Sequence, residues 1–95
     1  MDLGDAGVAL RAAATVDASG LSAERRGRFL IDVARAHLQR RNLDEAVETL
    51  EQAETITPEQ VRSHPLARQA IGDLLTIQAP ASPALQGLAR RAGVL

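Results

Sequence analysis

The residues that this sequence lacks already exclude several kinds of protein. Its 95 residues include no cysteine, tryptophan or tyrosine, and a single phenylalanine, Phe29. Without cysteine the chain can form neither a disulfide framework nor a thiolate metal site. Its apolar residues are mainly alanine, leucine, valine and isoleucine, and β-branched residues are sparse, which favours closely packed helices over strands. The composition therefore predicts one small all-α domain over residues 1–95.

Lysine is also absent, so every basic residue is an arginine, and the net charge is −1. Residues 21–41 carry six arginines against two acidic residues, whereas residues 43–60 carry six acidic residues and no basic one. A DNA-binding domain is expected to present a net basic surface, so we expect this segment not to bind nucleic acid directly. A basic helix followed by an acidic one predicts charge pairing between antiparallel neighbours.

No long apolar run and no basic leader is visible, so we expect neither membrane insertion nor secretion, and a cytoplasmic location. The two histidines, His37 and His64, do not form a metal-ligand pattern with the acidic residues, so we expect no metal site. Ser63 and His64 are neighbours in sequence, but adjacency does not create a nucleophile–base pair. With no glycine-rich phosphate loop either, the chain is expected to be no enzyme and to need no cofactor.

Capping residues and prolines divide the chain into five to six short helices. Ser22 precedes one helix, Asn42 and Glu45 have the spacing of a capping box, and Thr57 and Ser82 each stand directly before a proline. Gly93 is a natural end for the last helix. The expected helices are residues 3–16, 22–41, 43–56, a short turn at 58–63, 65–78 and 83–92.

Residues 3–18 and 43–58 are weak copies of each other. The identical pairs are Leu3/Leu43, Ala6/Ala46, Leu10/Leu50, Ala13/Ala53 and Thr15/Thr55. Self-similarity at a spacing of tens of residues indicates stacked supersecondary units, which usually bind partners rather than catalyse reactions. With only Asn42 between two expected helices, residues 22–56 are predicted to form an antiparallel hairpin.

Residues 27–60, which include most of this hairpin, resemble a tetratricopeptide repeat, in which two helices form a unit of about 34 residues. The matching positions are Leu30, Val33, Ala34, His37, Ala46, Leu50, Ala53 and Pro58. At Leu30, His37 and Leu50 the family usually has an aromatic residue. The longer stretch from Val16 to Leu66 is similar to the C-terminal tetratricopeptide-like half of actinobacterial helix-turn-helix (Xre-type) transcription regulators, and that resemblance covers about residues 3–93. The resemblance implies a short helical solenoid that regulates or senses by binding a protein or peptide.

By the same resemblance, residues 3–18 are the second helix of an incomplete repeat, 22–56 a complete repeat hairpin and 58–93 the C-terminal capping helices. Only two residues precede the incomplete repeat, so we expect either a truncated chain or a natural short form that pairs with another protein. An apolar face without a neighbouring helix seeks a partner, which predicts self-association, for example as a homodimer. That face consists of Leu3, Ala6, Leu10 and Ala13.

The resemblance also implies a concave partner-binding groove, formed in this chain by the first helix of the hairpin together with helix 65–78. The residues expected to face it are Arg28, Ile31, Arg35, Leu38 and Gln39. Two guanidinium groups above an apolar floor would suit an acidic peptide or a peptide C-terminus. The alternative is that Arg28 and Arg35 pair within the chain, with Asp32 or with the acidic residues of 43–60. Most ion pairs at a protein surface have no ligand, so we favour this simpler interpretation.

Overall fold

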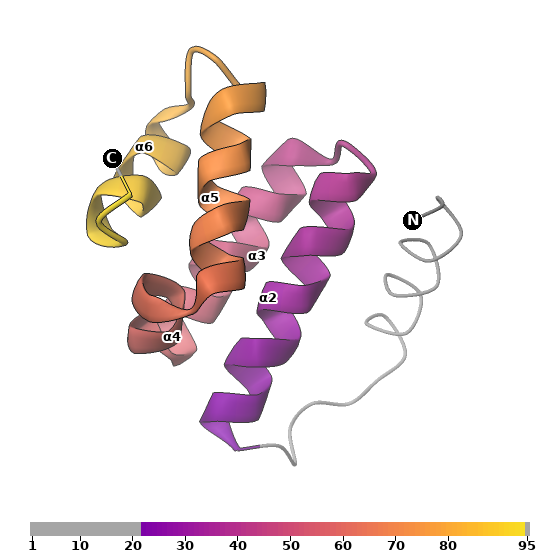
Figure 1. Ribbon diagram of the computed structural model, residues 1–95. Coiled ribbons are helices and arrows are strands. Elements are labelled where there is room, and N and C mark those ends of the chain that lie inside the picture. Colours follow the sequence, from indigo (N-terminus) through magenta and orange to yellow (C-terminus); the bar gives the residue numbers. More distant parts are fainter. Residues whose placement is uncertain (1–21, 95) are drawn as a thin grey trace.

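The computed structural model describes residues 22–94, and this part of the chain folds into five helices with no strand (Figure 1). They are α2 (Ala23–Gln39), α3 (Leu43–Ile56), α4 (Pro58–Ser63), α5 (Pro65–Ile77) and α6 (Pro83–Arg91). The all-α prediction is therefore confirmed for these residues, and each helix expected within them is present. The helix expected at 3–16 lies outside the described residues. No described helix has the length and apolar character needed to cross a membrane.

The helices pack as two pairs, α2 with α3 and α5 with α6, and the short α4 connects the pairs. Across the pairs, α2 contacts α5 and α3 contacts α6. Helices α2 and α5 run in the same direction: Arg28, near the start of α2, meets His64 just before α5, and Leu38 near the end of α2 shares a hollow with Ile77 at the end of α5 (Figure 1). The two helices therefore lie side by side along their lengths, and we call the line of contact between them the α2–α5 seam.

The core consists of leucine, isoleucine and valine side chains separated by alanines, as the composition predicts. Its largest fully buried side chains are Ile31, Leu50, Val61, Ile71, Leu74, Leu85 and Leu88. Burying one such side chain contributes about 1.5–3 kcal/mol to the free energy of unfolding. Alanines such as Ala46, Ala53 and Ala67, each fully buried, let the helix backbones approach closely. The core therefore relies on close helix contact, without large aromatic side chains.

The turn between α2 and α3 is not closed by the predicted capping box, because the side chain of Asn42 makes no capping hydrogen bond. Instead, the backbone N–H groups of Asn42 and Arg41 donate to the carbonyls of His37 and Leu38 over 2.9 and 3.0 Å. This is the Schellman arrangement, with Arg41 in the left-handed region at φ 61°. Gly93 closes α6 in the same way, at φ 73°, which confirms its predicted role.

The predicted cap at Thr57 is also wrong. Its hydroxyl donates to the carbonyl of Ala53 at the end of α3 and does not cap α4. The serine caps are confirmed, because Ser22 and Ser82 accept from backbone N–H groups three residues later, each over 3.2 Å. Tertiary packing explains the difference, since the backbone of Gly27 in α2 lies directly against the Thr57 side chain.

The charge pairing of α3 differs from the expected pairing with α2. Glu54 of α3 accepts from Nε of Arg91 in α6, with both carboxylate oxygens at 2.9 Å, and Glu51 lies 3.9 Å from the same guanidinium. The hydrogen bond that Arg91 donates to Glu54 is the main cause that raises the pKa of Arg91 above its usual value. No ion pair joins α2 to α3 within residues 22–94. The acidic helix therefore ties the two helix pairs together.

Candidate functional site: a groove between α2 and α5

Two adjoining hollows follow the seam between the C-terminal halves of α2 and α5. The larger, about 330 Å³, is lined by Leu38, Gln39, Arg41, Asp73, Thr76 and Ile77. The smaller, about 110 Å³, is lined by Arg35, Leu38, Gln39, Gln69, Ala70 and Asp73. Three residues border both hollows, so together they form one continuous depression, which we call the α2–α5 groove.

The walls of the groove combine charged, amide and apolar groups. Arg35 and Gln39 stand one helical turn apart on α2, opposite Gln69 and Asp73 at the same spacing on α5. Leu38 is buried at the floor, whereas Ile77 is 39% exposed at the upper end. Among residues 22–94, Ile77 is the only large apolar side chain that is exposed. In the described part of the chain Arg35 takes part in no ion pair. The groove thus offers a cation, amide donors and acceptors, and an apolar contact.

At the lower end of the same seam, Arg28 of α2 meets His64, the residue that caps α5. One terminal nitrogen of the Arg28 guanidinium lies 2.9 Å from Nε2 of His64. The other ring nitrogen, Nδ1, accepts from the backbone N–H of Leu66 over 3.1 Å, so His64 caps the start of α5. Nε of Arg28 also donates to Asp32 over 3.4 Å, and both side chains are about half exposed.

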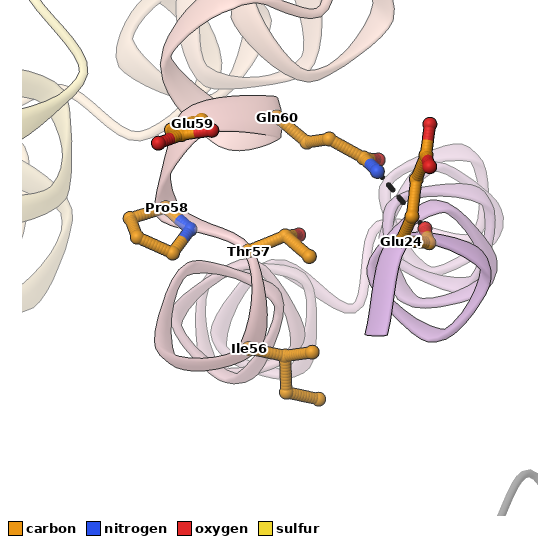
Figure 2. Close-up of a pocket in the computed structure, with 6 residues that line it drawn as sticks. All are labelled: Glu24, Ile56, Thr57, Pro58, Glu59 and Gln60. Carbon is orange, nitrogen blue, oxygen red and sulfur yellow. Dashed lines mark hydrogen bonds between the residues drawn. The ribbon is translucent and has the colours of Figure 1, made fainter. Parts of the chain in front are cut away.

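A separate hollow of about 490 Å³ lies where the start of α2 faces the α3–α4 junction. Figure 2 shows the Gln60 side chain extending across to α2, where its Nε2 donates to the backbone carbonyl of Glu24 over 2.9 Å. The other lining residues are Ile56, Thr57, Pro58 and Glu59. Its ionisable groups are two carboxylates without a histidine or a cation beside them, so this hollow contains no acid–base pair.

The structure brings together three of the five residues predicted to face a partner: Arg35, Leu38 and Gln39 line the groove. Arg28 lies further down the seam, and its contact with Asp32 agrees with the alternative interpretation for this arginine. The prediction that Ile31 faces a partner is wrong, because Ile31 is fully buried in the core and does not line the groove. Both α3 and α5 contact α2, so a side chain of α2 that points towards the seam, such as Ile31, can be covered completely.

The sequence predicted that helix 65–78 borders the groove, but it did not predict which of its residues line it. Gln69, Asp73 and Thr76 recur at helical spacing within residues 65–78, a pattern that marks one polar face beside the apolar stripe. The face predicted for self-association, formed by Leu3, Ala6, Leu10 and Ala13, lies outside the described residues.

No group of three or more potential metal ligands occurs in residues 22–94. No family model, no curated protein and no solved structure matches this chain.

Proposed function

We propose that this chain is a non-enzymatic interaction module that binds a segment of another protein along the α2–α5 groove. The observation that carries the proposal is the groove's composition: Arg35 without an ionic partner among residues 22–94, facing amides of both helices, and the exposed Ile77 at one end. Side chains from two parallel helices thus converge on one depression. Such a set can fix both the orientation and the register of a bound chain.

The shape of the site favours a peptide over a small molecule. The seam follows α5 from His64 to Ile77, which at the helical rise of about 1.5 Å per residue spans roughly 20 Å. An extended peptide advances about 3.3 Å per residue, so about six residues would fill it. A small molecule usually needs a more enclosed and more apolar cavity. The long, shallow and mixed lining therefore suits an extended segment with both polar and apolar side chains.

The arrangement of the helix pairs supports a regulatory role by way of the resemblance. In tetratricopeptide proteins the first helices of successive repeats line the binding groove, and α2 and α5 would take these positions, with α3 and α6 as second helices. We extend the proposal accordingly: this module belongs to a bacterial helix-turn-helix transcription regulator and controls it by binding a protein or peptide. The capture of such a segment would be the sensing event.

The test is selection of eight-residue peptides from a random display library on the immobilised full chain, followed by titration of the selected peptides. We expect Arg35→Ala to weaken their binding about tenfold, which corresponds to loss of one charge-assisted contact. Arg25→Ala is the matched control, because Arg25 is an exposed arginine on the same helix, outside the groove. Failure to select any peptide, or equal affinities for both variants, would refute the proposal.

Self-association is a second candidate function, and one observation favours it. The residues of α3 that correspond to Ala6, Leu10 and Ala13 in the internal repeat, namely Ala46, Leu50 and Ala53, are all fully buried. A segment with the same pattern is suited to bury the same face against a partner helix. Sedimentation velocity of the full chain across the micromolar range tests this, and a monomer at every concentration would exclude it.

A further inference from the structure

The contact between Arg28 and His64 brings two hydrogen-bond donors together. Nδ1 of His64 accepts from the N–H of Leu66, so a neutral imidazole must carry its proton on Nε2. The guanidinium nitrogen of Arg28, which lies 2.9 Å from Nε2, has no acceptor to offer. Two N–H groups therefore face the same space without an acceptor between them.

Asp32 does not resolve this conflict, and the other tautomer of His64 resolves it only by giving up the cap of α5. Asp32 contacts Nε of Arg28 over a long 3.4 Å, and it contacts neither the terminal nitrogen nor the ring. If the proton moved to Nδ1, Nε2 could accept from Arg28, but His64 would then lose its capping hydrogen bond to Leu66. An acceptor supplied from outside would let both donors bind while His64 keeps its cap.

We propose that Arg28 and His64 together bind the side-chain carboxylate of a glutamate or aspartate in the segment that occupies the α2–α5 groove. The two oxygens of one carboxylate can accept from the guanidinium and from Nε2–H at the same time. Arg28 is about half exposed, so an incoming carboxylate can reach it. Asp32 beside Arg28 makes a singly charged carboxylate a better match than a doubly charged phosphate.

The geometry also gives a spacing for the partner. Arg28 and Arg35 are seven residues apart on α2, which is roughly 10 Å along the helix. An extended peptide covers that distance in about three residues. The bound segment should therefore carry an acidic residue at one position and a second acceptor about three residues away, opposite Arg35.

This inference rests on the proposed function, and its experiment starts from the selected eight-residue peptides. We expect them to share an acidic residue, and its replacement by the matching amide to weaken binding to the wild-type chain about tenfold. In Arg28→Gln the acidic and amide peptides should bind equally. In His64→Asn, where the shorter amide can still cap α5 but supplies no Nε2–H, the difference should shrink. Arg25→Gln should leave it unchanged.

A second measurement tests directly which ring nitrogen of His64 carries the proton. Nitrogen NMR of the His64 ring in the full chain should show the proton on Nε2, and addition of an acidic peptide should shift that resonance. A proton found on Nδ1 would overturn the inference, as would acidic and amide peptides of equal affinity for the wild-type chain. If peptides bind and respond to Arg35→Ala but not to Arg28→Gln, only this inference fails. If no peptide binds, the proposed function fails with it.

Discussion

Adding one methyl group at Gly27 is expected to destabilise the protein, although alanine is the better helix former. Gly27 is buried within α2, where the backbone passes the Thr57 side chain at the α3–α4 junction. A Cβ at residue 27 would lie 3.0 Å from both Cβ and Cγ2 of Thr57, and closer still to its hydroxyl oxygen. Either the helix or the junction would have to move.

Two opposing effects set the size of the change. Alanine in place of glycine stabilises a helix interior by up to about 1 kcal/mol. Overpacking by one methyl group in a close contact costs about 1–3 kcal/mol. Because the added Cβ would meet three atoms of Thr57, the cost falls in the upper part of that range, about 2–3 kcal/mol, and Gly27→Ala should lower the free energy of unfolding by about 1–2 kcal/mol. In a domain of this size each kcal/mol lowers the melting temperature by about 4–8 °C.

The assay is urea and thermal unfolding followed by circular dichroism, since the chain has no tryptophan or tyrosine to report by fluorescence. Gly72→Ala is the matched control, because Gly72 lies within α5 and a Cβ there would meet nothing within 4 Å. It should stabilise the protein by about 0.5–1 kcal/mol. In a Thr57→Ala background, Gly27→Ala should cost less than in the wild type. Equal stabilisation by both glycine substitutions would refute the close approach of α2 to the α3–α4 junction.

Three further predictions concern single positions, and the same unfolding assay checks the first two. Arg41→Gly should stabilise the protein by about 1 kcal/mol, because Arg41 adopts the left-handed conformation that glycine occupies without strain. A loss of stability would show that the hydrogen bond from the Arg41 guanidinium to the Leu38 carbonyl contributes more than the relief of backbone strain. Arg91→Gln should cost only about 0.5 kcal/mol, and less in high salt, because the arginine is half exposed. Since its pKa is raised, the contribution of Arg91 is complete at neutral pH and disappears only when strong alkali removes the proton, so this cost should not vary across the neutral range. Asp73→Asn should increase the affinity of the groove for acidic peptides several-fold, measured by titration, and an unchanged affinity would place the peptide's acidic groups away from α5.

The sequence predicted the helices well because their boundaries are local. Ser22 and Ser82 cap the helices that follow them, and a proline starts α4, α5 and α6, as expected from short-range rules. The two failures, Asn42 and Thr57, depend on packing between distant residues. The left-handed turn at Arg41 closes the connection after α2 without a cap from Asn42. The contact with Gly27 keeps the Thr57 side chain away from the position in which it would cap α4.

The α2 residues of the groove were predicted from the sequence and the α5 residues were not, again because packing between distant residues decides the outcome. Helical spacing places Arg28, Ile31, Arg35 and Leu38 near one face of α2, but it does not say where a neighbouring helix covers that face. Helix α5 meets α2 along this face, so Ile31 is fully buried whereas Arg35 remains at the edge of the seam. Which residues line the groove is therefore decided by the α2–α5 contact, which no local pattern shows.

The charges along the seam limit what it can bind. Arg28, Arg35 and Arg41 lie along the α2 side, and Asp32 and Asp73 lie among them. A strongly acidic chain would gain from the three arginines but would be repelled by both aspartates. A neutral chain would leave the donors of Arg28 and His64 without an acceptor. Under the proposed function, the pattern would therefore select for acidic residues at particular positions rather than for negative charge in general, which is how an interface gains specificity from electrostatics.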